Sequence, residues 1–379
     1  MENILIRARA LRQMLHVYPE LSGSEVHTAT VVRECMQAYH PDEIIDHVGG
    51  NGIAFIYSGG KRGKTLLFRA DTDALPIQEN NSMLYKSRNN GIAHLCGHDG
   101  HTAILAGLGD LLNRQRPEKG KVILLFQPAE ETGQGAASVL KDNRINRFEP
   151  DFVFALHNLP GYSFGSIITR SGVFASASKG LIIHLKGVPA HAAYPENGIS
   201  PAPVLAELIK TLPELQHQDN YSDMVMLTIV HARLGEPAFG VSPSDAILMA
   251  TLRSFEVTDM DVLTDKILEY VQELCLSNKV QLTIEWTDEF IPVVNSTDAV
   301  SIIEDAAKSC GYAVIKPVHP FPWSEDFGQF TALYNGAMFG LGAGEEHQPL
   351  HSPYYDFPDG LIEKGINMFY QIVKQITKD

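Results

Sequence analysis

The chain has 379 residues, of which 44% are hydrophobic and 20% charged, and its formal net charge is −15 at pH 7. This length exceeds what one simple core supports and predicts two domains. The acidic surface would repel nucleic acid and anionic membranes, so we expect a small molecule or a peptide as partner.

The sequence carries none of the usual signals for export or membrane insertion. No stretch approaches the ~20 consecutive apolar residues of a membrane span. The first twelve residues lack the continuous apolar segment of a signal peptide. The four cysteines (Cys35, Cys96, Cys275 and Cys310) are widely scattered and do not resemble a disulfide framework. We therefore expect a cytoplasmic protein.

The first part of the chain is typical of an α/β domain. Apolar residues at helical spacing predict helices over residues 4–15 and 24–39, with Ser24 as the cap of the second helix. Continuous apolar runs lie at residues 65–70, 122–126, 152–156 and 337–341, and a helix is expected over residues 102–112. Such runs indicate buried strands of a mainly parallel sheet, in which sites form beyond the carboxyl ends of the strands.

The middle of the chain has a different pattern. Strands are expected at residues 181–185, 224–233, 246–255 and 280–286, and helices at residues 200–215 and 261–277. The order β-α-β-β-α-β is the ferredoxin-like arrangement. Because it lies between the third and fourth strands of the first sheet, we predict an α+β domain at residues 179–289. It would be inserted into a helix-flanked, mainly parallel mixed-sheet domain made of residues 1–178 and 290–379.

Residues 96–101 (CGHDGH) bring a thiol, two imidazoles and a carboxylate together. Thiolate and imidazole are ligands that zinc and similar divalent ions prefer. Taken alone, the hexapeptide also fits a buried cysteine beside surface histidines. Further ligand types follow the other predicted strands, and the full candidate set is Cys96, His98, Glu131, His157 and His351. Five ligands exceed the need of one zinc ion and suit two ions about 3.5–4 Å apart.

Carboxylates near these residues suggest supporting roles. Glu130 and Glu131 are adjacent, so one can bind metal while the other accepts a proton from water at the metal. The alternative is a solvated acidic loop. Asp71 and Asp73 follow the first strand, and either could hold a metal ligand through a hydrogen bond. We favour Asp73, against a simple turn role.

Two residues of the predicted insertion carry functional chemistry. His191 lies in a loop after a strand and is as readily structural as functional. Arg253 lies in the strand at residues 246–255. It could bind a substrate carboxylate bidentately, or it could be an ordinary exposed strand residue.

Several motifs together resemble the amidohydrolase branch of the aminoacylase/carboxypeptidase metallopeptidase superfamily, which includes hippurate hydrolases, auxin-conjugate hydrolases and N-acetyl-diaminopimelate deacetylases. They are RADTDALP at residues 69–76, CGHDGH at 96–101, QPAEE at 127–131 and LHSP at 350–353. YPELS at residues 18–22 and SEDF at 324–327 also match, so the resemblance covers nearly the whole chain.

The resemblance implies a zinc-peptidase-like fold with two divalent ions held by the five candidate ligands, and Glu130 as general base. It implies that the insertion is a lid or dimerisation domain of a homodimer. It also suggests that His191 enters the partner subunit's active site and stabilises the oxyanion of the tetrahedral intermediate. A cysteine ligand favours zinc, while the resemblance allows manganese, nickel or cobalt.

The expected reaction is hydrolysis of the amide bond of an N-acyl amino acid or a similar small amide. A dipeptidase or aminopeptidase on the same scaffold, or a non-catalytic ligand-binding homologue, are the alternatives. Three departures from the family bear on substrate preference, one of which is Ala250-Thr251 where the family usually has Gly-Thr before the lid arginine. Gly240 begins a GVSP segment where the family usually has Asn-Val-Ile-Pro, and Trp323 stands where a small residue commonly precedes SEDF.

Overall fold

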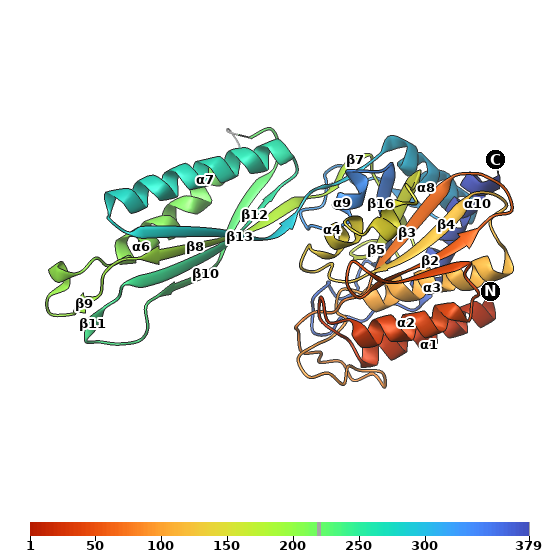
Figure 1. Ribbon diagram of the computed structural model, residues 1–379, viewed down its shortest axis with the longest axis horizontal. Helices are drawn as coiled ribbons and strands as arrows, with labels where there is room; N and C mark the ends of the chain where they lie inside the picture. Colours follow the sequence, from red (N-terminus) through yellow and green to blue (C-terminus); the bar gives the residue numbers. More distant parts are fainter. Residues whose placement is uncertain (218–220, 379) are drawn as a thin grey trace. The chain divides into compact units, whose positions relative to one another are not determined.

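The computed structural model describes residues 1–217 and 221–378, which form two compact units (Figure 1). Unit 1 comprises Met1–Phe174, Val293–His319 and Glu325–Asp379, and unit 2 comprises Ala175–Pro292 and Pro320–Ser324. The boundaries predicted from the sequence group residues 320–324 with the first domain. In the structure, hydrogen bonds from Ser176 Oγ (2.8 Å) and Arg253 Nη1 (3.0 Å) to the carbonyl of Pro322 hold this segment in unit 2.

Unit 1 is built on an eight-stranded mixed sheet with the order β1-β2-β4-β3-β5-β16-β6-β15. Its strands are β1 (Glu43–Val48), β2 (Gly52–Ser58), β3 (Thr65–Asp71), β4 (Lys121–Gln127), β5 (Phe152–Pro160), β6 (Ile167–Ile168), β15 (Val314–Ile315) and β16 (Gly336–Gly344). The four central strands, β4, β3, β5 and β16, are mutually parallel and buried. The prediction of a mainly parallel mixed sheet is therefore confirmed.

The register of the central strands brings their carboxyl ends to one edge of the sheet. Asp71 at the end of β3 pairs with Gln127 at the end of β4. His157 near the end of β5 pairs with Gly340 of β16. Residues that follow these strands are consequently close in space although they are far apart in the sequence.

Helices flank this sheet. They are α1 (Glu2–Val17), α2 (Val26–Gln37), α3 (His98–Arg114), α4 (Gly135–Leu140), α5 (Asn143–Asn146), α8 (Thr297–Cys310), α9 (Gly328–Thr331) and α10 (Gly360–Lys378). Apolar residues of α1, α2, α3, α8 and α10 pack with one face of the strands in a single large core. No helix among the described residues is long and apolar enough to cross a bilayer.

Two local predictions about helix starts were wrong. Ser24 does not cap α2, whose first turn is capped by the Glu20 carboxylate through the backbone N–H groups of His27 (3.1 Å) and Thr28 (2.8 Å). Glu20 lies in the preceding turn, so its side chain can accept hydrogen bonds from the backbone N–H groups at the start of α2, which have no partner within the helix and receive none from Ser24. The helix expected over residues 102–112 begins four residues earlier, at His98.

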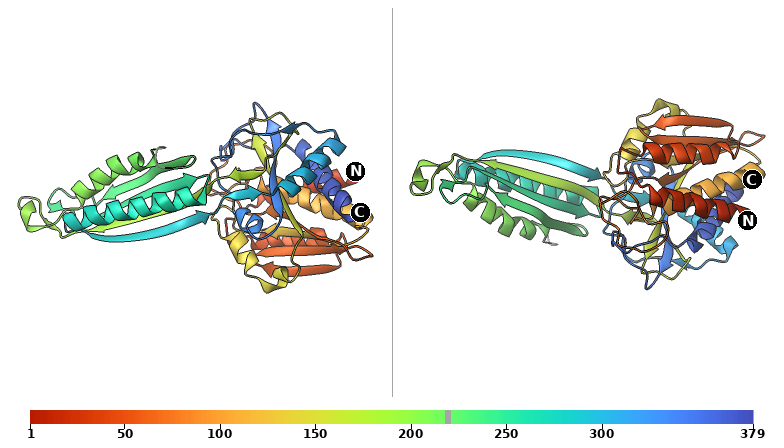
Figure 2. Two further views of the ribbon diagram at one scale, coloured as in Figure 1. Left: turned by 90° about the horizontal axis from the view of Figure 1, so that it is seen from above. Right: turned by 90° about the horizontal axis from the view of Figure 1, so that it is seen from below.

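Unit 2 is a four-stranded antiparallel sheet with the order β10-β12-β8-β13. Its strands are β8 (Ala177–Lys186), β10 (Val225–Leu234), β12 (Asp245–Ser254) and β13 (Gln281–Phe290), and its helices are α6 (Ala202–Thr211) and α7 (Val257–Ser277). Both helices cover one face of the sheet, as the two views in Figure 2 show. Chain order and strand order match the predicted ferredoxin-like arrangement.

Smaller paired segments complete the fold. In unit 2, β9 (Ala190–His191) pairs with β11 (Val241–Ser242) beyond the ends of β8 and β12, near the one-turn helix Pro195–Asn197. A second short 3₁₀ helix, Leu212–Gln216, follows α6. The strands β7 (Gly172–Ala175) and β14 (Val293–Asn295) form a separate two-stranded sheet.

A buried ion-pair cluster joins α1 to α3 and gives a pH-dependent prediction. His16 is fully buried; burial opposes its charged form, but hydrogen bonds to Asp99 (2.8 Å) and Glu79 (3.3 Å) prevail and raise the pKa of His16 to about 9. A histidine whose pKa is higher in the folded state stabilises it fully below the unfolded value of about 6.5, and this stability is lost as pH rises through about 9.

We therefore expect His16→Asn to reduce the loss of unfolding free energy between pH 7 and pH 10. The wild-type loss from this group should reach at most about 3 kcal/mol. Urea unfolding at several pH values checks this, with the exposed His27→Asn, whose ring has no hydrogen bond among the described residues, as control. Equal slopes in wild type and His16→Asn would contradict the assignment.

Candidate metal centre

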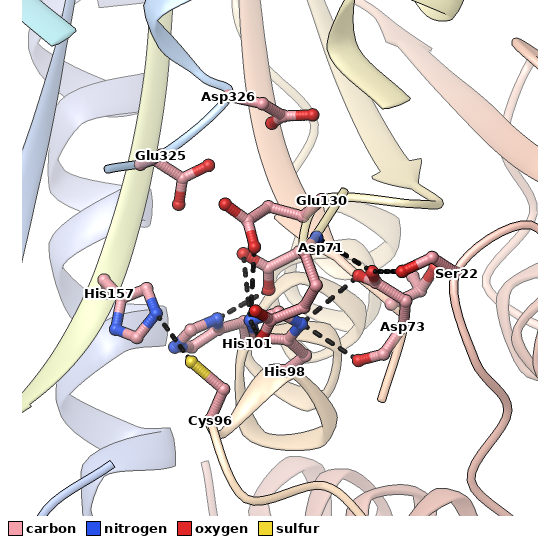
Figure 3. Close-up of polar contacts among 12 residues, drawn as sticks. Ser22, Asp71, Asp73, Cys96, His98, His101, Glu130, His157, Glu325 and Asp326 are labelled. Carbon is pink, nitrogen blue, oxygen red and sulfur yellow. Dashed lines mark hydrogen bonds and ion pairs between the residues drawn. The ribbon is translucent and has the colours of Figure 1, made fainter. Parts of the chain in front are cut away.

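The five candidate ligands all lie in unit 1, at the carboxyl edge of the central sheet (Figure 3). Cys96 and His98 lie at the start of α3, and His157 lies near the end of β5. Glu131 follows β4, and His351 lies in the loop between β16 and α10. Four separate stretches of chain thus supply one thiol, one carboxylate and three imidazoles to the same place.

Hydrogen bonds orient the rings of the two buried histidines. His98 Nδ1 donates to the backbone carbonyl of Asp73 at 2.9 Å, and His157 Nδ1 donates to the backbone carbonyl of Asn158 at 2.9 Å. In the neutral ring, each bond places the proton on Nδ1 and leaves the lone pair on Nε2. His157 Nε2 lies 3.4 Å from the sulfur of Cys96. The Nε2 atoms are thus the ones prepared for a metal.

The ligand atoms form overlapping groups, each within 4.8 Å of one another. One group is Cys96, His98 and His157, and a second is Cys96, Glu131 and His351. Cys96 is common to both. His98 Nε2 also lies 3.7 Å from Glu131 Oε1, which in turn lies 3.8 Å from His351 Nε2. Two adjacent clusters that share the thiol are the donor set expected for a pair of cations.

Orphaned polar atoms in this cluster test whether it fits a metal. Within the described residues, the buried atoms His98 Nε2 and Glu131 Oε1 have no hydrogen-bond partner. Burial raises the pKa of Glu131 to about 7 and raises the pKa of the Cys96 thiol well above its usual range, with neighbouring carboxylates adding to the shift at Cys96. Divalent cations would satisfy the lone pairs and stabilise the anions, so the residues fit the group.

His351 differs from the other ligands in its exposure. Its side chain is 50% exposed, whereas that of His98 is 1% exposed. Its backbone adopts a positive φ of 65° and its N–H donates to the carbonyl of Leu95 at 2.8 Å. This hydrogen bond fastens the His351 loop directly beside Cys96, at the open side of the cluster.

Glu130 lies against the same cluster but is placed differently from Glu131. Its Oε2 is 4.0 Å from His98 Nε2, and it makes no hydrogen bond through its carboxylate in the described residues. The residue is 5% exposed, and burial together with nearby Glu325 and Glu131 raises the pKa of Glu130 well above its usual value. A buried carboxylate without a hydrogen bond is costly, so its presence here indicates a function.

Asp73 connects two ligand segments. Its Oδ2 accepts from the backbone N–H of Glu131 at 3.0 Å and from Ser22 Oγ at 2.7 Å, and its backbone carbonyl holds His98. The predicted supporting residue thus acts through its carbonyl on the histidine and through its carboxylate on the glutamate. Ser22 belongs to the YPELS motif, which is thereby tied to the centre.

A buried arginine organises the acidic residues behind the cluster. Arg69 donates to Asp71 (2.7 Å), Glu325 (2.9 Å) and Asp326 (2.7 Å), and all four side chains are at most 1% exposed. The guanidinium of Arg69 therefore joins the SEDF motif to strand β3. Arg69 was assigned no role from the sequence, although a cation within a buried apolar strand already indicates carboxylate partners.

Position 97, between two candidate ligands, requires glycine both because of its backbone conformation and because of the atoms packed against it. Its φ is +99°, and a Cβ atom there would lie 2.2 Å from Asn158 Oδ1 and 2.9 Å from Tyr355 Oη. We expect Gly97→Ala to lower the free energy of unfolding by about 2–4 kcal/mol, combining backbone strain with overpacking. Denaturant unfolding measures this.

Gly60→Ala is the matched control, because Gly60 has no positive φ and a methyl group there would meet nothing within 4 Å. It should change the free energy of unfolding by less than about 1 kcal/mol. Equal effects of the two substitutions would contradict the packing described at Gly97.

The two candidate residues of unit 2 are described within that unit. His191 is exposed, and its Nδ1 accepts from the backbone N–H of Ala193 at 3.0 Å, which places the ring proton on Nε2. Arg253 is half-buried; its Nη1 donates to the carbonyl of Pro322 and to Ser324 Oγ. In the described chain no carboxylate pairs with Arg253, and its Nε and Nη2 make no hydrogen bond.

Comparisons with known proteins agree on one family. The model of peptidase family M20/M25/M40 matches residues 67–375. The N-acetyl-L-cysteine deacetylase of Bacillus subtilis (strain 168) is 29% identical, over 97% of this chain and 87% of that protein. The hippurate hydrolase of Campylobacter jejuni subsp. jejuni is 27% identical, over 97% and 96%. A solved dinuclear metal-binding M20 peptidase of Bacillus subtilis has a TM-score of 0.84 and 25% identity, covering 100% and 99% of the two chains.

Proposed function

Because the chain belongs to peptidase family M20/M25/M40, we propose that it is a dinuclear metal-dependent amidohydrolase that cleaves N-acyl amino acids or similar small amides. The names of the deacetylase and hippurate hydrolase relatives support this substrate class. We further propose that Cys96, His98, Glu131, His157 and His351 hold the ions, which we expect to be zinc or manganese, with nickel or cobalt also compatible. Four free cysteines favour a reducing compartment, the cytoplasm.

One observation carries the choice of an enzyme over a binding protein. Glu130 keeps a buried carboxylate beside the ligand cluster without a hydrogen-bond partner among the described residues. A protein that only bound metal would gain nothing from a second carboxylate there and would bear the cost of its burial. A general base for water needs such an unengaged acceptor.

The chain's own residues then divide the chemistry of amide hydrolysis. Two divalent ions, when bound, would polarise the amide carbonyl and lower the pKa of water. Glu130 accepts the proton of the attacking water and later delivers it to the departing amine nitrogen. Asp73 holds His98 and the Glu131 backbone in place during these steps, which keeps the base and the ligands in fixed register.

Unit 2 supplies the remaining groups in this proposal. His191, with its proton on Nε2, is a hydrogen-bond donor suited to the developing oxyanion. The unengaged Nε and Nη2 of Arg253 form an edge that matches a carboxylate bidentately, as in the free carboxylate of an N-acyl amino acid. A half-buried guanidinium without an acidic partner in the described chain favours this role over that of an ordinary strand residue.

Features of unit 2 support a homodimer in which His191 acts on the partner's site. β8 runs from Ala177 to Lys186, about 30 Å at 3.3 Å per residue, and His191 lies in β9, beyond the Lys186 end of that strand. Exposed apolar side chains lie near His191. Tyr194 is three residues later in the chain and is 59% exposed, Val241 pairs with His191 and is 51% exposed, and Phe239, two residues before Val241, is fully exposed. Such a cluster at one end of the unit is typical of an interaction surface.

Subunit complementation tests this arrangement. His191→Asn and Glu130→Gln homodimers should each be nearly inactive. An equal mixture, after subunit exchange, should recover about a quarter of wild-type activity, because half of the dimers then contain one site with an intact Glu130 and a partner's intact His191. Absence of recovery, with exchange verified by native mass spectrometry, would contradict action across subunits.

A substrate panel tests the function itself. N-acetyl and N-benzoyl amino acids should be hydrolysed with added Zn²⁺, Mn²⁺ or Co²⁺, and the corresponding N-acyl amines, which lack the carboxylate, should be poorer substrates. Free dipeptides serve as the comparison for a peptidase. No hydrolysis of any N-acyl amino acid, by protein that binds metal, would favour a ligand-binding protein instead.

A further inference from the structure

A buried hydrogen-bonded relay runs beneath the proposed metal centre and includes no ligand side chain. His101, one turn after His98 on α3, donates from Nδ1 to Asp71 Oδ1 at 2.6 Å. Its Nε2 lies 2.6 Å from Asn158 Oδ1, and Asn158 Nδ2 donates to Tyr355 Oη at 2.6 Å. These four side chains come from β3, α3, β5 and the loop after β16, and all are fully buried.

His101 differs from the candidate ligands in how its nitrogens are used. Both of its ring nitrogens are engaged, one by a carboxylate and one by an amide. In His98, by contrast, Nδ1 is held by a carbonyl and the buried Nε2 has no hydrogen-bond partner in the described chain. Asp71, His98 and His101 form a further group of possible ligand atoms within 4.8 Å of one another. Because both nitrogens of His101 are already engaged, its ring acts as a spacer beside the cluster rather than as a ligand (Figure 3).

The relay contacts the ligands through packing. The ring of His101 lies edge-on against the ring of His157, with centroids 4.7 Å apart and planes at 70°. It lies 5.6 Å from the ring of His98. His157 is thus confined on one side by His101, while its Nδ1 is held by the Asn158 carbonyl.

The far end of the relay abuts the backbone between two ligands. Asn158 Oδ1 and Tyr355 Oη occupy the space into which a side chain at position 97 would project, at 2.2 and 2.9 Å from its Cβ. The backbone from Cys96 to His98 therefore packs directly against the Asn158 and Tyr355 side chains of the relay. Removing His101 would take one hydrogen-bond partner from Asp71 and one from Asn158, which keep Arg69 and Tyr355 respectively, and would loosen the packing around the Cys96–His98 backbone and the His157 ring.

We propose that His101 is a positioning residue for metal binding, acting on His157 and on the Cys96–His98 segment through Asp71 and Asn158. This inference rests on the proposed metal site but adds a residue that the ligand set does not contain. Residues that orient metal ligands typically change metal affinity by about 10–100-fold when they are replaced. Their loss should weaken metal binding without deleting a metal position.

The experiment measures metal affinity and coordination rather than turnover. Metal-free wild type, His101→Leu, His101→Asn and His101→Gln are titrated with Co²⁺ and Zn²⁺ against a competing chelator. The visible absorption of the Co²⁺ forms reports the thiolate and imidazole geometry. Asparagine retains a donor for Asp71 and glutamine retains a polar group near the Nε2 position, so each should recover part of the loss.

His94→Leu is the matched control. His94 is equally buried and lies two residues before Cys96, but neither of its ring nitrogens has a partner among the described residues. Burial lowers the pKa of His94 to about 4, so the substitution removes no charge at neutral pH. It should change metal affinity by less than about 3-fold, well below the range for residues that orient ligands.

The expected result for His101→Leu is two bound ions at saturation, affinity weakened by about 10–100-fold and an altered Co²⁺ spectrum. Affinity equal to that of His94→Leu, at similar stability of the metal-free proteins, would overturn the proposal. Loss of a whole metal equivalent at saturation would make His101 a ligand and would overturn it equally. Failure of wild type to bind metal would instead refute the proposed function.

Discussion

Replacing Glu130 with glutamine will lower kcat by about 10²- to 10⁴-fold while the protein keeps its metal. The amide has the same shape as the carboxylate but cannot accept the proton of water. Glu130 makes no hydrogen bond to the described residues through its carboxylate, so the substitution breaks no hydrogen bond and alters only the 4.0 Å approach to His98 Nε2. Steady-state kinetics on the best substrate of the panel, with metal content measured on the same samples, tests the expectation.

The neighbouring residue provides the matched control. Glu131→Gln makes the same chemical change one position away, but Glu131 forms a ligand group with Cys96 and His351, whereas the groups that include Glu130 contain neither of these two residues. It should therefore lose metal, and its activity should rise with added metal, whereas the activity of Glu130→Gln should not. Identical behaviour of the two variants, or unchanged kcat in Glu130→Gln, would contradict the division of roles.

Removal of the metal will abolish hydrolysis, and the ligand variants will differ in how much metal they retain. Cys96 is shared by two ligand groups, whereas His351 belongs to one and is half exposed. Cys96→Ala should consequently bind fewer than about one ion per chain, and His351→Ala should keep at least one. Dialysis against a chelator, then titration with Zn²⁺ or Mn²⁺ and elemental analysis, measures both.

Readdition of metal to the wild-type protein should restore activity, and urea unfolding should show greater stability with metal than without, because the ions bind only the folded state. Activity that survives chelation with no detectable metal would refute the dependence. Equal metal retention by Cys96→Ala and His351→Ala would contradict the shared position of the thiol.

Much of the fold follows from apolar patterning. The four central strands are continuous apolar runs, and the ferredoxin-like order of unit 2 is legible because each of its strands and helices has a clear period. Helices α8 and α10 and the strands β1 and β2 were not predicted. The sequence of β2 carries the same continuous apolar signal, whereas β1 is an edge strand with an irregular burial pattern.

The sequence predicted less of the geometry of the candidate site than of the fold. The ligand types could be read from their spacing after strands, but their mutual distances depend on strand register. The hydrogen bond that fixes His98 goes to the backbone carbonyl of Asp73. Because every residue has such a carbonyl, the sequence does not show which one is used. The role of His101 depends likewise on Asn158 and Asp71, which only folding brings to opposite sides of its ring.

Anomalous X-ray diffraction from crystals grown with Zn²⁺ or Mn²⁺ tests the central claim most directly. We expect two metal peaks per chain, with Cys96 Sγ, the Nε2 atoms of the three histidines and a Glu131 oxygen within about 2.0–2.5 Å of one or both. Glu130 should approach neither ion directly. Peaks bound elsewhere, or none at saturating metal, would contradict the proposed centre.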